Sequence, residues 1–376
     1  MKEVGLYVHI PFCKQKCLYC DFPSFSNIDN LMDDYIEALN KEILEKASNY
    51  KIKSLFIGGG TPSYLDEKNL ISLLNTINKL EFLENAEKTI ECNPGTLKEE
   101  KLRIMYDKGI NRLSFGLQST DNNILKSIGR IHSYEEFKEN YKTARKIGFK
   151  NINIDMMFGL PKQTVDICLS NLKDIIQLNP EHISFYSLII EEGTPFCSMY
   201  DKGLLILPSE DEERQMYNKA KVLLKENGYH QYEISNYAKD NKECFHNKIY
   251  WKCDEYIGVG SAASSYINGK RIKNIESVNT YIKNIKNNKC IIEDEIINNE
   301  SDSIEEFMFM GLRMMKGIKE EEFEKRFNKK VDEVYKSVIE NNINKNLLSR
   351  KDGRIFLTEK GIEFSNLVMS DMILDR

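Results

Sequence analysis

The sequence predicts an α/β protein, an open partial (β/α)6 barrel followed by a small winged-helix-like α+β domain. Apolar segments of strand length alternate with helical patterns over about the first 240 residues. Repeated β–α units indicate a parallel sheet with helices outside. Only about six such units are present, which is too few for a complete eight-stranded barrel. Helices followed by a hairpin pattern near the C-terminus predict the second domain.

The predicted strands are short apolar runs that end in glycine, proline or polar residues, with helical periodicity between them. They cover residues 6–10, 54–57, 88–92, 112–116, 152–158 and 182–188, and the clearest helices cover 31–47, 70–80 and 211–227. The pattern then weakens. We therefore assign residues 1–236 to the barrel, 237–301 to a connecting region and 302–376 to the C-terminal domain.

The C-terminal domain is predicted to contain helices at 304–315, 320–327 and 331–341 and a hairpin over 347–357, with Thr358 capping a last helix. A winged-helix pattern raises the possibility of DNA binding. However, residues 302–376 hold 14 basic and 15 acidic residues, so the electrostatic footprint of a DNA-binding domain is missing. We expect this domain to form a lid or a docking surface over the barrel mouth.

The overall charge does not favour a nucleic acid or an anionic membrane as a partner. The chain has 53 basic and 58 acidic residues, a net charge of −5. The sequence contains no run of about 18 apolar residues, so no membrane span is predicted. The N-terminus begins directly with a strand pattern and does not resemble a signal peptide. We expect a cytoplasmic protein in a reducing compartment.

Three cysteines after the first predicted strand form the most informative motif. Cys13, Cys17 and Cys20 have the spacing Cys-x3-Cys-x2-Cys. Three thiolates on one loop suit three irons of a [4Fe–4S] cluster and leave the fourth iron open to a small molecule. A zinc site is the alternative, but zinc sites usually show Cys-x2-Cys pairs with a fourth ligand nearby. The next cysteine is Cys92, so the motif favours the cluster.

Other polar and glycine residues lie at or near the ends of the predicted strands. In parallel barrels this carboxyl-end rim is where sites are built. The glycine run 58–60 would allow a ligand to approach the backbone closely, and a buried carboxylate such as Asp155 requires a partner. The other candidates at this rim are Thr61, Glu91, Gln118 and Arg130. Their shared placement indicates one common site.

These motifs resemble the radical S-adenosylmethionine (SAM) family that includes oxygen-independent coproporphyrinogen III oxidase (HemN) and the haem chaperone HemW. The resemblance covers nearly the whole chain. It is carried by residues 7–13, 58–63, 91–94, 112–119, 129–130, 153–155, 159–161 and 192–195.

The resemblance implies that Cys13, Cys17 and Cys20 bind a [4Fe–4S] cluster. It also implies SAM contacts from Tyr7, Tyr19, Gly59, Gly60, Thr61, Glu91, Gln118, Arg130 and Asp155. In this family the cluster supplies an electron that cleaves SAM to a carbon radical. The sequence leaves open whether SAM is cleaved or regulatory here, and whether one or two SAM molecules bind.

Three features favour the chaperone over the oxidase. The first cysteine is at position 13, whereas the oxidase has a long N-terminal extension. The oxidase carries a further cysteine where this chain has Phe22. Residues 246–251 match the H-N-x-x-Y-W motif of the chaperone family. An anaerobic radical SAM enzyme acting on another tetrapyrrole is a third alternative with weaker support.

The resemblance links His246 to haem binding, and imidazole is a common axial ligand of haem iron. Tyr250 and Trp251 would then pack against a porphyrin face. The alternative is a histidine that orders a polar turn. The family usually has a second histidine where this chain has Ser264, so His230 is a candidate replacement.

We therefore predict a haem chaperone that binds a [4Fe–4S] cluster, SAM and haem and delivers haem to apo-proteins. The expected partners are haem, haem-accepting apo-proteins and an electron donor for the cluster. Membrane association is expected only through partner proteins. The alternative function is oxidative decarboxylation of coproporphyrinogen III to protoporphyrinogen IX.

Overall fold

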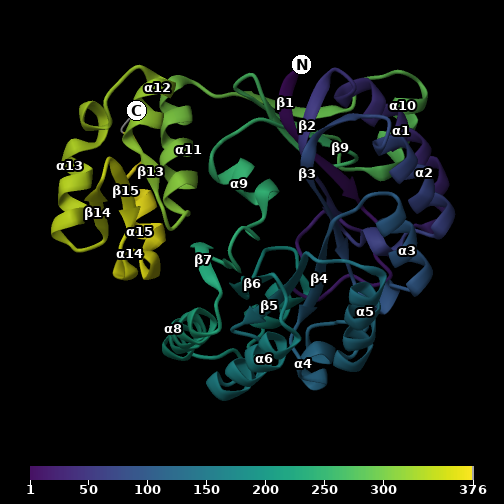
Figure 1. Ribbon diagram of the computed structural model, residues 1–376, viewed down its shortest axis with the longest axis horizontal. Helices are drawn as coiled ribbons and strands as arrows, with labels where there is room; N and C mark the ends of the chain where they lie inside the picture. Colours follow the sequence, from purple (N-terminus) through teal and green to yellow (C-terminus); the bar gives the residue numbers. More distant parts are fainter. Residues whose placement is uncertain (375–376) are drawn as a thin grey trace.

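The computed structural model describes residues 1–374. Six parallel strands follow one another in chain order through a curved sheet (Figure 1). They are β1 (Lys2–Ile10), β2 (Tyr50–Gly59), β3 (Glu81–Cys92), β4 (Arg112–Gln118), β5 (Ile152–Phe158) and β6 (His182–Ser187). The predicted partial (β/α)6 barrel is confirmed, and each of its six predicted strands is present.

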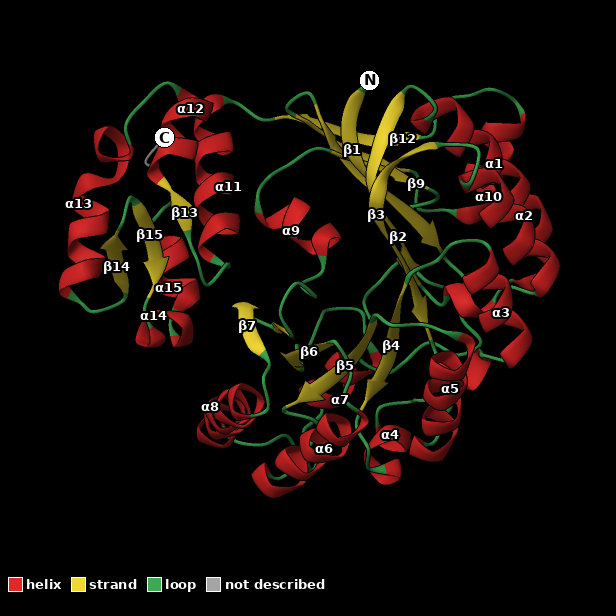
Figure 2. Cartoon of the chain, viewed as in Figure 1, coloured by secondary structure: helices red, strands yellow, loops and turns green. Residues whose placement is uncertain are grey.

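The helices that connect these strands cover the outside of the sheet (Figure 2). The longer ones are α1 (Met32–Ala47), α2 (Glu67–Ile77), α3 (Glu99–Asp107), α5 (Tyr134–Ile147), α6 (Val165–Leu178) and α8 (Glu210–Glu226), and the short ones are α4 (Asn122–Ser127) and α7 (Pro195–Asp201). In α1 the buried face carries Tyr35, Leu39 and Ile43, spaced so that they share one side of the helix. The core therefore lies between the helices and the sheet.

The sheet extends beyond the six parallel strands at both ends. Beyond β6 lie β8 (Asn236–Ala238) and β7 (His230–Glu233). Beyond β1 lie β9 (Tyr256–Val259), β10 (Ser264–Ile267), β11 (Lys270–Asn274) and β12 (Ile292–Ile297). The segment 237–301, predicted as a connecting region, is thus largely built into the barrel sheet. It also holds α9 (Phe245–Trp251) and α10 (Val278–Lys286).

One buried carboxylate joins this extension to the barrel. Glu42 of α1 is 1% exposed and accepts hydrogen bonds from the backbone N–H of Gly260 (2.7 Å), from Asn274 Nδ2 (2.8 Å) and from the Tyr281 hydroxyl. Lys46 Nζ lies 2.8 Å from the same carboxylate. Because these partners come from the loop after β9, from β11 and from α10, Glu42 fixes three separate segments against α1.

The C-terminal domain has its own hydrophobic core, formed by residues between 304 and 372. Its elements are α11 (Glu300–Leu312), β13 (Ile318–Lys319), α12 (Glu320–Phe327), α13 (Val331–Asn344), β14 (Leu348–Lys351), β15 (Arg354–Leu357), α14 (Glu359–Glu363) and α15 (Ser365–Ser370). β13 joins the predicted hairpin as a third strand. The Thr358 side chain accepts from the Gly361 N–H, so the predicted cap is confirmed.

This domain lies beside the barrel, with α9 in the space between them (Figure 1). Arg271 of β11 pairs with Glu306 of α11 through two hydrogen bonds of 2.7 and 2.8 Å. The Ile234 N–H donates to the Arg313 carbonyl (3.2 Å). These contacts run to β11 and to the turn after β7, and Lys221 of α8 also pairs with Glu359 of α14 (3.2 Å). They do not cross the carboxyl ends of the parallel strands. No helix within residues 1–374 has both the length and the apolar character required to cross a membrane.

We predict that Glu42→Ala lowers the free energy of unfolding by about 3 kcal/mol, because several buried donors lose their acceptor at once. Glu45→Ala on the same helix is the control, since Glu45 is exposed and lies 3.9 Å from Lys41. That change is expected to shift stability by less than about 0.5 kcal/mol. Urea denaturation followed by circular dichroism measures both, and equal effects of the two variants would contradict the role of Glu42.

Candidate functional site

The cysteine loop leaves the end of β1 and is held by backbone hydrogen bonds to three other segments. The Cys13 N–H donates to the Phe25 carbonyl (2.9 Å), and the Leu18 N–H donates to the Ile128 carbonyl (3.1 Å). The Thr61 N–H donates to the Phe12 carbonyl (2.8 Å). The loop that carries the three thiols is therefore fixed before any ligand binds.

The three cysteines and most of the predicted SAM residues line one cavity of about 140 Å³. Cys13, Cys17 and Cys20 line it, together with Tyr19, Gly59, Gly60, Thr61, Glu91, Gln118, Arg130 and Asp155. Tyr7 lies outside this lining, and its hydroxyl is hydrogen-bonded to His9 Nδ1 (3.0 Å). The rim inferred from the strand ends is therefore one physical site, with Tyr7 beside it.

Parallel strand order brings these side chains together. Gly59 ends β2, Glu91 lies one residue before the end of β3, and Gln118 ends β4 with a φ of 75°. A non-glycine residue in this left-handed region is strained, and such residues cluster at functional sites. The Gln118 Oε1 accepts a hydrogen bond from the Tyr186 hydroxyl (2.9 Å), which fixes the amide toward the cavity.

Tyr186, in β6, lines the cavity as well and was missing from the predicted set. The sequence did contain a signal for it. The apolar run predicts a strand over residues 182–188, and Tyr186 stands near its carboxyl end, where the rim lies.

One cation, Arg130, is hydrogen-bonded to a thiol, and Lys16 lines the same cavity. Arg130 donates from Nη1 to Cys17 Sγ (3.4 Å) and from Nη2 to the Gly116 carbonyl, while its buried Nε has no partner among residues 1–374. An arginine here balances the negative charge that thiolates bring. Cys13 Sγ lies 3.4 Å from the Thr61 hydroxyl, although burial still raises the pKa of the Cys13 thiol.

Two carboxyl groups face the same space. Burial and then the neighbouring Asp155 raise the pKa of Glu91 to about 8, although the Gly59 N–H donates to it (3.1 Å). Burial also raises the pKa of Asp155, which accepts from Asn153 Nδ2 (2.7 Å). Both carboxyl groups would gain stability from a cationic or hydroxyl-bearing ligand.

The donor set suits a polynuclear cluster. The three thiols are free and line a common space, yet within residues 1–374 no three His, Cys, Asp or Glu side chains are grouped closely enough to hold a single metal ion. In a [4Fe–4S] cluster each thiolate binds a different iron, so the sulfurs stand further apart than around one ion. The residues present therefore fit a cluster held by three cysteines.

A second cavity of about 420 Å³ adjoins the first and shares Tyr19, Cys20, Glu91, Asp155 and Tyr186 with it. It reaches from Arg112 inside the barrel to Phe22 and Ile189, which are 60% and 66% exposed. Asn247, from the H-N-x-x-Y-W motif, also lines it. No described residue after Asn247 lines either cavity, so the expected lid over the mouth is not formed by residues 302–374.

His246 is buried beneath this second cavity and is fully engaged. Nδ1 is hydrogen-bonded to the Ser54 hydroxyl (2.8 Å), Nε2 to the Tyr250 hydroxyl (2.9 Å), and the ring stacks on Phe56 at a centroid distance of 5.4 Å. Glu87 accepts from the N–H groups of Phe245 and His246 (both 3.0 Å) and so caps α9. In this conformation His246 anchors α9 to β2 and has no free nitrogen for a metal.

The remaining haem candidates also lie away from the cavities. Trp251 packs against the Arg313 guanidinium at 4.4 Å and lines a different cavity, of about 410 Å³, at the junction with the C-terminal domain. His230 is exposed and pairs with Asp240 (3.3 Å), and Ser264 is exposed at the start of β10. The structure therefore brings none of these residues together with the cysteines.

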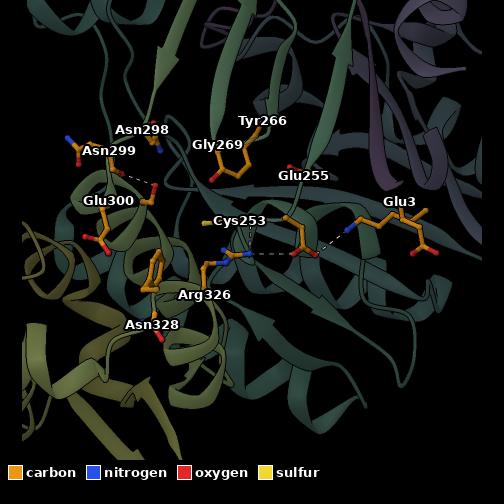
Figure 3. Close-up of a pocket in the computed structure, with 14 residues that line it drawn as sticks. Glu3, Cys253, Glu255, Tyr266, Gly269, Asn298, Asn299, Glu300, Arg326 and Asn328 are labelled. Carbon is orange, nitrogen blue, oxygen red and sulfur yellow. Dashed lines mark hydrogen bonds and ion pairs between the residues drawn. The ribbon is translucent and has the colours of Figure 1, made fainter. Parts of the chain in front are cut away.

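A separate polar cavity of about 690 Å³ lies between the barrel and the C-terminal domain (Figure 3). Asp254, in its lining, forms ion pairs with Lys53 (3.2 Å) and Arg326 (3.9 Å). Arg326 also donates to the Lys252 carbonyl (3.1 Å). These contacts make the cavity part of the junction that holds the two domains together.

Comparison with known proteins agrees with this arrangement. Residues 7–173 match the Radical SAM superfamily, and residues 299–364 match the HemN C-terminal domain. The chain is 40% identical to the Heme chaperone HemW of Lactococcus lactis, over all of this chain and 98% of the relative. It is 37% identical to that of Bacillus subtilis, over 96% and 97%. A mitochondrial Radical S-adenosyl methionine domain-containing protein 1 of Danio rerio is 33% identical over 86% of this chain and 75% of the relative.

Among solved structures, Escherichia coli coproporphyrinogen III oxidase (HemN) aligns with a TM-score of 0.86 at 22% identity, covering 99% of this chain and 90% of the other. At that identity the match establishes the fold alone. The fold and the cysteine-lined cavity define a radical SAM protein with a HemN-type C-terminal domain. The chain belongs to the HemW family. This membership implies a [4Fe–4S] cluster and SAM as cofactors.

We predict a measurable pH signature for the burial of His246. Burial, with the nearby charges of Arg112 and Lys53, lowers its pKa from 6.5 to about 3. Between pH 6.5 and pH 3, His246 is therefore protonated in the unfolded chain but neutral in the folded protein. Its contribution to the free energy of unfolding is complete above pH 6.5 and is lost as the pH falls toward 3. At pH 5 the loss from His246 is about 2 kcal/mol.

The test compares the wild type with His246→Asn by denaturant titration at pH 7 and pH 5. The variant is expected to be less stable at pH 7 and to lose about 2 kcal/mol less between the two pH values. His230→Asn, at an exposed position, is the control and should follow the wild type. An identical pH dependence in His246→Asn would show that His246 is not held neutral inside the protein.

Proposed function

We propose that the protein is a haem chaperone of the HemW type, which holds a [4Fe–4S] cluster and SAM in the barrel and passes haem to apo-proteins. The observation that carries the proposal is the full-length similarity to chaperones of that name. The position at which the oxidase pattern has a fourth cysteine is held by Phe22, an exposed side chain at the cavity mouth.

We assign cluster binding to Cys13, Cys17 and Cys20, because these three free thiols line the smaller cavity from one loop beside the glycine turn. The fourth free thiol of this lining, Cys92, comes from the end of β3 instead. When bound, the cluster supplies an electron to SAM. Around it, the chain's own residues orient the ligands. Arg130 balances the charge at Cys17. We assign the backbone of the turn at Gly59 and Gly60, which lines the same cavity, to the amino-acid end of SAM.

The other residues assigned to SAM differ in the kind of polar group that they offer. Glu91 and Asp155 offer carboxyl groups to a ribose diol or an ammonium, and Gln118 offers an amide held by Tyr186. Tyr19 and Thr61 complete the wall. Tyr7 contributes from behind this wall, since it stacks on Phe56 at 6.4 Å and its hydroxyl is bound to His9.

Haem binding by His246 stays a prediction, and it requires that one hydrogen bond of the imidazole be broken. Iron ligation at Nε2 requires the hydrogen bond to Tyr250 to open, and ligation at Nδ1 requires the bond to Ser54 to open. Because α9 is a helix of seven residues capped by Glu87, a shift of this helix is the movement that would release the imidazole. Delivery to apo-proteins and an electron donor for the cluster belong to the same proposal.

The cluster assignment predicts that Cys17→Ala, purified without oxygen, loses the brown charge-transfer absorbance and the bound iron and sulfide while remaining folded. Folding is retained because Cys17 is only partly buried at the cavity edge. Cys290→Ala, which removes an exposed thiol, is the matched control and should keep its full iron content. A cluster-replete Cys17→Ala protein would disprove the ligand assignment.

The chaperone proposal predicts that the anaerobically prepared holoprotein binds haem and gives it up to apomyoglobin, a haem-accepting probe. It also predicts no catalytic conversion of coproporphyrinogen III with SAM and a reductant. Visible spectroscopy follows the haem transfer, and chromatography follows protoporphyrinogen and 5′-deoxyadenosine. Sustained formation of protoporphyrinogen would establish the oxidase instead.

A further inference from the structure

Arg112 is a buried cation without a partner. It begins β4, is 1% exposed and points into the barrel, where it lines the larger cavity. Its Nε has no hydrogen-bond partner, and within residues 1–374 no carboxylate lies within ion-pair distance of its guanidinium. An unpaired charge inside a protein is strongly unfavourable. Its presence requires an explanation beyond packing.

The acidic groups nearest to Arg112 are committed elsewhere. The Glu87 carboxylate accepts from Cys244 Sγ (3.3 Å) and from two N–H groups of α9. Asp155 accepts from Asn153 (2.7 Å) and from the Ser114 hydroxyl (3.5 Å). These carboxyl groups favour the charged guanidinium from a distance, but none of them covers it. The positive charge is therefore available to a ligand.

The cavity that Arg112 lines changes character along its length. The exposed side chains of Phe22 and Ile189 stand at the mouth, and Phe56 and Met157 lie in the walls. Carboxyl groups line the cavity as well, namely Asp21, Glu91, Asp155 and Glu191, so a carboxylate ligand is favoured only where it meets the Arg112 guanidinium. At the inner end lie Arg112 and the amide of Asn153. A ligand that matches this cavity has an apolar body at the mouth and a carboxylate that reaches inward.

We propose that Arg112 binds the carboxylate of a ligand that enters the barrel. The inference rests on the proposed function, which supplies two ligands with that group, a haem propionate and the methionine carboxylate of SAM. The apolar mouth favours the propionate, since a tetrapyrrole has the flat apolar body that Phe22 and Ile189 would contact. A guanidinium holds a carboxylate through two parallel N–H bonds, which gives geometric selectivity as well as affinity.

The test compares haem with haem dimethyl ester, which has the same ring but no free carboxylate. The wild-type holoprotein is expected to bind haem about 10- to 100-fold more tightly than the ester, as a charged hydrogen bond predicts. Arg112→Met should lose this preference, and Arg112→Lys should keep part of it. Arg103→Met, which removes an exposed arginine paired with Glu99, should behave as the wild type.

Thermal unfolding of the ligand-free variants separates ligand binding from a structural role. Because Nε of the guanidinium lacks a hydrogen-bond partner and no carboxylate among residues 1–374 pairs with it, Arg112→Met should have an unchanged or higher melting temperature. A lower melting temperature together with equal loss of affinity for haem and its ester would overturn the inference.

Equilibrium dialysis with SAM and decarboxylated SAM identifies the source of the carboxylate. If Arg112→Met weakens SAM but not its decarboxylated analogue, and leaves the preference for haem over its ester intact, the carboxylate is that of SAM. If the wild type binds no haem at all, the chaperone function fails and the SAM measurement alone decides the role of Arg112. The inference is wrong if Arg112→Met shows the same preference as the wild type both for haem over its ester and for SAM over decarboxylated SAM.

Discussion

The contact between the cysteine loop and the glycine turn after β2 is the constraint on which the site depends. The Gly60 N–H donates to the Ile10 carbonyl (2.7 Å), which continues the β1–β2 pairing past the end of the strands. A Cβ at Gly60 would stand 2.8 Å from the Phe12 carbonyl oxygen and 3.0 Å from Cys13 Sγ. A side chain there would push the loop away, so glycine is required for the thiols and the turn to share one wall.

At the opposite end of the barrel lies the helix α9. There α9 is held by Glu87 of β3 and by Ser54 of β2, through His246. The motif that carries His246 therefore also contributes Asn247 to the cavity lining and places Trp251 against Arg313 of the neighbouring domain. The short helix α9 thus connects the ligand cavity, through Asn247, to the domain junction, through Trp251.

The sequence predicted the parts of the structure that obey simple periodicity. The parallel strands and the shared rim followed from apolar runs and from the rule that their carboxyl ends meet at one edge. The extension from β9 to β12 was not predicted as strands, because these elements are short and β12 is exposed throughout, with acidic residues at its centre. A half-solvated edge strand lacks the apolar run that marks a buried one.

Burial was the other property that sequence reasoning did not supply. His246 was assigned to haem from its motif, whereas its two hydrogen bonds depend on Ser54, which is far away in the chain. Arg112 stood inside a recognised motif, yet nothing in the sequence distinguished a paired arginine from an unpaired one. Both facts arise from the tertiary packing of β2, β4 and α9 around one interior.

These two residues also act on each other through that interior. After burial itself, the charge of Arg112 is a cause of the low pKa of His246, and it acts in the same direction on His182. A carboxylate bound to the guanidinium would cancel much of this field, and so would raise the pKa of both histidines. His246 is neutral at pH 7 in either case, so the effect on α9 arises at acidic pH, where occupation of the Arg112 site would let the imidazole take up a proton, and weaken its hold on β2, at a higher pH. The ligand cavity and the helix that closes it are thus coupled by electrostatics, without any change in their direct contacts.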